Sequence, residues 1–228
     1  MIKTISLLAL LVIVGYVGYT LMNSNEGLKN NEGKVALVKK EKLTPVAIKL
    51  GMLALDSDRS VIEWEGRKKF IPGYVDRGTI RVKDGIVVIK DGVAKDGIFT
   101  IDMTSIAAVS TGKGSGETML TEHLKSEDFL DVENYPNVIF SFKKITETET
   151  PTIYNVVGDL TIKNKTNEIT FPATIGEDED GFVRVRASLE LDRTLWNVRY
   201  GSGKFFDNLG DNMIEDMFGL KLDLVFKG

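Results

Sequence analysis

Residues 122–140, EHLKSEDFLDVENYPNVIF, decide the fold that this sequence predicts. A short helical run, which holds the single histidine of the chain, His123, leads through an acidic turn to Pro136. Beyond the proline, apolar side chains alternate at Val138, Phe140 and Phe142. A period of two places every second side chain on the same face of a strand. The stretch therefore predicts a short helix followed by a strand with one buried face.

The same alternation recurs along most of the chain after residue 60. It is visible at residues 62–64, 80–82, 99–103, 156–162, 169–171, 183–189 and 220–226. Asp-Gly pairs supply the positive φ angles of tight hairpins, and such turn signals occur at Lys83–Gly85, Lys90–Gly92, Lys95–Gly97 and Asp178–Gly181. Eight or so short strands with few long helices predict a β-sandwich or an up-and-down barrel. A doubly wound sheet would need helices of about 10–15 residues between the strands, and the sequence lacks them.

Two segments depart from the strand pattern. In Thr118–Leu130, apolar residues such as Met119 and Leu124 fall on one helical face, and Asn208–Met217 is a second short candidate. A lone short helix can bury one apolar stripe against a barrel end. We therefore expect one or two short capping helices.

The first 22 residues predict a membrane segment. After Met1-Ile2-Lys3, residues 4–22 are 19 positions without a charge. A signal-peptide core usually has about 7–15 apolar residues, whereas a membrane span needs roughly 17–25. No Ala-x-Ala cleavage site follows, so we expect an uncleaved signal anchor, with a cleaved signal peptide as the alternative. Residues 23–45 are polar and predict a tether, and residues 46–228 predict the barrel domain.

Composition excludes several classes of function. The net charge is −4 and no basic block stands out, so no nucleic-acid partner is expected. The chain has no cysteine, which excludes disulfides, thiol chemistry and cysteine-based zinc sites. With one histidine and no recognisable nucleophile motif, we expect a protein that is not an enzyme and needs no cofactor.

Several blocks carry a resemblance to a known family. They are residues 120–142, residues 154–166 (YNVVGDLTIKNKT), residues 191–200 (LDRTLWNVRY) and an opening strand at residues 60–66. Together they resemble the YceI-like family over most of residues 48–226. Asn164 stands where that family usually has glycine, and asparagine tolerates the left-handed turn. The residues at 120–121 and 76–78 depart from the family's Arg-Asp and His-Thr-Gly strings, so the sequence resembles a divergent branch.

This resemblance implies a fold, a location and a ligand. Members of the YceI-like family are periplasmic, lipocalin-like antiparallel β-barrels that hold a long isoprenoid or other lipid. It implies an all-β, up-and-down barrel of about eight strands on the periplasmic side of the cell envelope. The barrel is then anchored in the inner membrane by the N-terminal segment, or secreted to the periplasm if that segment is cleaved. The implied partners are a polyisoprenoid or isoprenoid quinone and the membrane, and the oligomeric state stays open.

Alternate faces of the central strands supply the candidate lining of a lipid cavity: Phe99, Ile101, Phe140, Phe142, Val156, Leu160, Val185, Leu189 and Leu222. A slip of one residue would invert any of these strands. The interior of an eight-stranded barrel is either just filled by side chains or hollow enough for one ligand. A solid-cored barrel that docks onto an envelope partner is therefore the alternative. We expect His123 to be structural, because one imidazole without cysteine does not make a typical zinc site.

Overall fold

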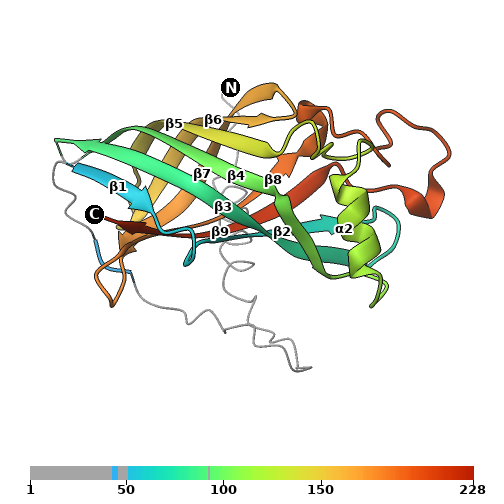
Figure 1. The fold of residues 1–228 in the computed structure, drawn as a ribbon, viewed down its shortest axis with the longest axis horizontal. Helices are drawn as coiled ribbons and strands as arrows, with labels where there is room; N and C mark the ends of the chain where they lie inside the picture. Colours follow the sequence, from blue (N-terminus) through green and yellow to red (C-terminus); the bar gives the residue numbers. More distant parts are fainter. Residues whose placement is uncertain (1–42, 46–50, 92) are drawn as a thin grey trace, which may run out of the picture. The chain divides into compact units, whose positions relative to one another are not determined.

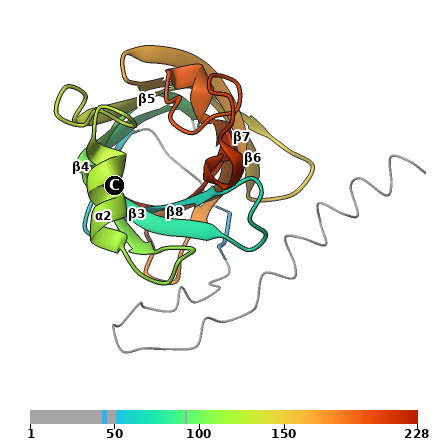
Figure 2. The same ribbon diagram turned by 90° about the vertical axis from the view of Figure 1, so that its right-hand side faces the viewer.

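Eight strand positions close into an antiparallel barrel, seen from the side in Figure 1 and from one end in Figure 2. The structure is a computed structural model that describes residues 43–45, 51–91 and 93–228. From β2 the order around the barrel is β9, β8, β7, β6, β5, β4 and β3, and β3 pairs with β2 again. The strands are β1 (Gly51–Leu55), β2 (Val61–Arg67), β3 (Val75–Lys90), β4 (Val93–Ser110), β5 (Asn137–Glu147), β6 (Ile153–Ile162), β7 (Lys165–Glu177), β8 (Val183–Asp192) and β9 (Met217–Lys227). The predicted up-and-down barrel of about eight strands is confirmed.

The expected signal anchor, residues 1–22, and residues 23–42 of the expected tether lie outside the described residues. Thr44 already touches the barrel, because it forms an isolated bridge with Glu177 of β7. The backbone N–H of Thr44 donates to Glu177 O at 3.0 Å, and the reverse bond measures 2.9 Å. Among the residues that the structure describes, no helix has the length and apolar character needed to cross a membrane.

Strands β1 and β2 share one position in the barrel wall. Both pair with β3 on one side and with β9 on the other. The chain turns between them at residues 56–60, opposite Val225 of β9. The backbone of Val225 accepts from Asp56 N–H at 2.8 Å and donates to Ser60 Oγ at 3.0 Å. These two hydrogen bonds connect the turn at residues 56–60 to β9, so the sheet stays hydrogen-bonded between β1 and β2.

Two of the expected turns are wrong. Residues 83–85 lie inside β3 and residues 95–97 lie inside β4, so these strands run for 16 and 18 residues. The register shifts between Val82 and Asp84, which marks a bulge within the ladder. The turn expected at Lys90–Gly92 is present, because β3 ends at Lys90, β4 begins at Val93 and Asp91 has a φ of 55°. Gly85 is not part of a turn; it lies inside β3, where it leaves room for the ring of Phe99.

The turn between β6 and β7 follows the sequence prediction. Lys163 and Asn164 have φ angles of 47° and 57°, which is the left-handed pair that a two-residue hairpin requires. Asn164 therefore takes the role that the YceI-like pattern usually gives to glycine. The turn predicted at residues 178–181 is also present, with Gly181 at a φ of 81°.

One α-helix, α2 (Glu117–Lys125), lies at one end of the barrel in the described residues (Figure 2). Gly116 precedes it with a φ of 96°, and Leu120 and Leu124 pack against the core. The second expected helix is wrong. Residues 208–217 contain only the 3₁₀ turn η2 (Gly210–Asn212), because Asn208 and Gly210 have positive φ angles that interrupt helical backbone.

Candidate functional site

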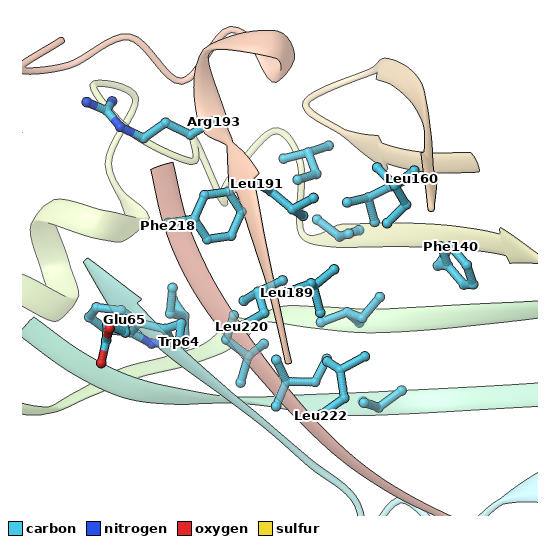
Figure 3. A pocket seen from close by; sticks show the side chains of 18 of the residues that line it. Trp64, Glu65, Phe140, Leu160, Leu189, Leu191, Arg193, Phe218, Leu220 and Leu222 are labelled. Carbon is cyan, nitrogen blue, oxygen red and sulfur yellow. The ribbon is translucent and has the colours of Figure 1, made fainter. Parts of the chain in front are cut away.

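The barrel encloses a cavity of about 1360 Å³. All nine strands contribute to its wall, and α2 lies along it at one end. Figure 3 shows that the labelled side chains from β5, β6, β8 and β9 are hydrocarbon groups that point into this space. The volume exceeds the ~300–1000 Å³ of ordinary small-molecule pockets. The interior is therefore hollow, which removes the solid core that the docking alternative required.

All nine residues chosen from the alternation lie on the cavity wall. The register explains why they meet: Phe99 of β4 is opposite Phe140 of β5, and Phe140 is opposite Leu160 of β6. On the other side of the barrel, Leu189 of β8 is opposite Leu220 of β9. The remaining members of the set are Ile101, Phe142, Val156, Val185 and Leu222. That these residues bind a ligand stays a prediction.

The prediction omitted much of the wall that β2, β3 and β9 supply. The omitted lining residues include Ile62, Trp64, Ile80, Val82, Phe218, Leu220, Leu224 and Phe226. Their signal was the same alternation, visible at 62–64, 80–82 and 220–226. The candidate lining was taken mainly from strands in the middle of the sequence order. A closed barrel has no edge strands, so every strand contributes an inward face.

Three aromatic side chains occupy space that glycines leave open on the adjoining strands. A Cβ at Gly85 would lie 2.9 Å from Cε1 of Phe99, and one at Gly78 would lie 2.5 Å from Cε2 of Trp64. A Cβ at Gly158 would lie 2.5 Å from Cε2 of Phe140. The missing side chains let these rings pack toward the wall, so that three of the largest groups inside the barrel leave its centre open.

Arg193 fixes the chain where β8 ends beside α2. It is 6% exposed and donates to four backbone carbonyls, two of which are Val198 O at 2.9 Å and Tyr200 O at 2.8 Å. Burial lowers the pKa of Arg193 from its ordinary value, and Asp216 and Asp192 act against that shift. Next along the chain, the indole of Trp196 donates to Leu160 O at 2.9 Å and links η1 (Arg193–Trp196) to β6.

Most polar groups of the wall lie at the same end, although Thr146 and Glu147 at the far end of β5 also line the cavity. Figure 3 places the charged groups of Arg193 and Glu65 there, away from Phe140. Tyr74 also lines the cavity, and burial together with Asp76 raises the pKa of its phenol, so the ring stays neutral at physiological pH. The cavity thus combines an apolar interior with a polar end beside α2.

His123 lies in this polar end and packs between two rings. Its imidazole meets Phe129 and Tyr200 edge to face, with centroid distances of 5.2 and 4.5 Å. The side chain is 35% exposed, and Nε2 lies 3.9 Å from Oδ2 of Asp128. No group of three or more metal-ligating side chains occurs in the described part of the chain. The structural role expected for His123 rests on these ring contacts and stays a prediction.

A closed antiparallel barrel around a large apolar cavity defines the lipocalin-like architecture. The chain belongs to the YceI-like domain family, whose model matches residues 53–226. The resemblance drawn from the sequence is thereby confirmed.

Individual relatives are similar over most of the barrel. The chain is 27% identical to a UPF0312 protein of Pseudomonas putida strain W619, over 68% of this chain and 84% of that protein. It is 32% identical to protein YceI of Escherichia coli O6:H1, over 42% of this chain and 54% of that protein.

Solved structures share the fold. The barrel is similar to Burkholderia cenocepacia BcnA, with a TM-score of 0.57 and 23% identity over 75% of this chain and 98% of BcnA. It is also similar to a polyisoprenoid binding domain from Saccharophagus degradans, with a TM-score of 0.56 and 13% identity. That match covers 79% of this chain and 99% of the domain.

Proposed function

We propose that this protein binds a long apolar lipid, of the polyisoprenoid or isoprenoid quinone type, inside its barrel. The observation that carries the proposal is the cavity of about 1360 Å³ with an apolar wall. Water in such a space would find few hydrogen-bond partners on the aliphatic and aromatic wall, whereas a hydrocarbon chain needs none.

The hydrophobic effect supplies the driving force. Each Å² of apolar ligand surface removed from water contributes about 25 cal/mol. Because this contribution is non-directional, the wall holds a chain tightly without specifying its chemical detail. The description of the related Saccharophagus degradans domain as polyisoprenoid binding supports the choice of an isoprenoid as the ligand class. Storage, transport or protection under stress are the tasks that such binding serves.

The N-terminal segment adds a location to this proposal. Residues 4–22 are uncharged and no Ala-x-Ala site follows them, so the segment anchors the protein in the inner membrane with the barrel on the periplasmic side. A tethered carrier meets membrane lipids at a high effective concentration. N-terminal sequencing of the mature protein tests the anchor, and a sequence that begins after residue 22 would contradict it while leaving export intact.

Lipid content tests the binding proposal directly. The full chain is extracted gently from its host membrane and examined by native mass spectrometry, and the bound material is then identified after organic extraction. We expect about one lipid per barrel in the wild type. Phe140→Asp and Leu189→Asp should each abolish it, because an unpaired carboxylate in an apolar wall is strongly disfavoured. A wild-type barrel that folds but carries no lipid would refute the proposal.

A matched control separates the cavity from general effects of charge. Leu195 is 58% exposed and lies outside the cavity wall, so Leu195→Asp introduces the same carboxylate in η1. This variant should keep its lipid. Circular dichroism establishes that each variant retains its β-structure. Equal loss of lipid from Leu189→Asp and Leu195→Asp would mean that the cavity is not the binding site.

A further inference from the structure

Exposed aromatic side chains gather on two loop segments at the end of the barrel where α2 lies. We call residues 67–74 and 199–206 the rim segments; Figure 2 looks onto this end of the barrel. Phe70 in the first segment is 55% exposed, and Phe205 and Phe206 in the second are 44% and 48% exposed. Exposed rings clustered on a surface are a feature of interaction sites.

The rim segments form one surface although more than 120 residues separate them in the sequence. Lys68 forms a bridge with Ile214, and Lys69 N–H donates to Met213 O at 2.9 Å. Ile214 N–H in turn donates to Gly201 O at 2.8 Å, which joins the second segment to the same short stretch. The two groups of exposed rings therefore stand on a hydrogen-bonded platform.

This surface is continuous with the cavity wall. Lys68 and Tyr74 of the first segment and Tyr200 of the second belong to both the rim and the cavity wall, as does Ile214 between them. A molecule bound at the rim therefore touches the same residues as a molecule that enters the barrel. Because the rim segments and the cavity wall share these residues, a lipid that enters or leaves the cavity at this point contacts the rim.

The charges of the rim segments are all positive. They contain Arg67, Lys68, Lys69, Arg199 and Lys204 and no acidic residue. Arg67 is paired with Glu65, and Lys204 with Asp192 and Asp216. Within the described part of the chain, Lys68, Lys69 and Arg199 form no ion pair. Lys68 lies 5.3 Å from the ring centre of Tyr74, and Arg199 lies 4.6 Å from that of Phe205. The chain as a whole has a net charge of −4, and the stretch that joins the rim segments carries Asp207, Asp211, Glu215 and Asp216, so the excess of cations is confined to the rim segments themselves.

We propose that the rim segments dock onto an anionic lipid bilayer, with Phe70, Phe205 and Phe206 inserted at the headgroup level. Aromatic rings beside lysine and arginine suit this layer, because the rings enter the boundary of the acyl chains while the cations contact anionic headgroups. The inference rests on the proposed lipid-binding function, and it supplies the route: a lipid passes from the bilayer into the cavity without crossing water. The partner is the membrane surface itself.

A tryptophan reporter tests docking in the full chain, whether or not the N-terminal segment anchors it. Phe205→Trp places the reporter in the rim, and Ile98→Trp, at a position 52% exposed on β4, places it on the outer wall of the same protein. Vesicles of phosphatidylglycerol and brominated phosphatidylcholine quench only an indole that enters the acyl region. The wild type, with Trp64 and Trp196, gives the background.

We expect bromolipid quenching above background at residue 205 and none at residue 98. Each unit of positive charge removed near an anionic surface weakens binding about fivefold, so Lys69→Glu in the Phe205→Trp chain should weaken docking about 25-fold. Vesicles of phosphatidylcholine alone, or high salt, should also reduce the quenching. Equal quenching at both positions, or none at residue 205, overturns the proposal. A Phe205→Trp reporter that becomes buried without vesicles, together with dimer formation, overturns it in favour of self-association.

Lipid content separates this inference from the proposed function. Native mass spectrometry of the same chains reports whether the cavity is occupied. An occupied cavity with an unquenched rim refutes docking alone. A quenched rim on a protein that never carries lipid refutes the proposed function and leaves the membrane surface as the partner of the rim.

Discussion

Replacing Gly85 by alanine should force the ring of Phe99 away from the cavity wall. The three atoms nearest to a Cβ at Gly85 all belong to that ring, with Cε1 at 2.9 Å and Cδ1 closer still. Carbon atoms pack best about 3.5–4.0 Å apart, so the ring must move by about 1 Å. Phe140 and Phe226, with ring centroids 6.1 and 5.9 Å away, stand beside it, so the movement disturbs its neighbours or narrows the cavity.

The cost follows from two opposing effects. Overpacking a well-ordered interior costs about 1–3 kcal/mol. Alanine in place of glycine restricts the unfolded chain and returns about 0.4–1 kcal/mol, since Gly85 does not have a positive φ. Gly85→Ala should therefore lower the free energy of unfolding by up to about 2.5 kcal/mol. In a Phe99→Leu chain the ring is gone, and the same substitution should be neutral or stabilise by up to about 1 kcal/mol.

Urea denaturation of the wild type, both single variants and the double variant measures the coupling between the two positions. Gly66→Ala in β2 is the matched control, because a Cβ there would meet nothing within 4 Å. Lipid extracted per barrel should also fall in Gly85→Ala and recover in the double variant. If Gly85→Ala costs the same in both backgrounds, the ring is not the obstacle and the packing argument fails.

Three other perturbations test the polar end of the barrel and its supports. His123→Ala should cost about 1–3 kcal/mol, because it removes two edge-to-face ring contacts; stoichiometric zinc that disappears in this variant would contradict the structural role. Trp196→Phe removes the donor to Leu160 O and should cost about 1–3 kcal/mol in urea denaturation, whereas an unchanged midpoint would contradict it. Burial acts to raise the pKa of Asp192, but hydrogen bonds from Lys204 and Thr194 outweigh it, so this pKa lies below the ordinary 3.8. The depressed pKa stabilises the fold above about pH 3.8, and this stabilisation is lost as the pH falls through the folded pKa. Asp192→Asn should therefore lower the free energy of unfolding at pH 7 and lower it less in acid. A loss of stability that does not depend on pH would refute this prediction.

Local patterns in the sequence were sufficient for the strand faces and for some turns. Asn164 is an example, since its position between two alternating segments predicts a left-handed turn whatever the rest of the chain does. The candidate lining was predictable for the same reason, because a strand in a closed barrel has one face inside. The position of Gly85 shows the limit of this reasoning. An Asp-Gly pair indicates a turn locally, but here the glycine accommodates a ring from the next strand, which only the register reveals.

Features that depend on distant segments could not be predicted. Acidic residues around Met213 and Ile214 suggest a helix within residues 208–217. Instead, Asn208 and Gly210 have positive φ angles, and Ile214 bridges Lys68 and donates its N–H to Gly201 O, so local backbone and tertiary hydrogen bonds together determine the course of this segment. The rim was missed for the same reason. Neither segment stands out alone in the sequence, and the surface exists only because Lys68, Ile214 and Gly201 bring the two loops together.

Because the strand is interrupted between β1 and β2, two separate segments form this position of the barrel wall. Strands β3 and β9 run past both segments: β1 pairs with four residues of β3 and two of β9, and β2 pairs with six residues of β3 and five of β9. A change of length or sequence in β1 therefore acts on the end of the barrel away from α2 (Figure 1), where β1 pairs with Ile86–Ile89 of β3, and not on the pair between Trp64 and Gly78. Because different segments of the chain build the two ends of the cavity, its extent at the β1 end can change while the polar end beside α2 stays the same.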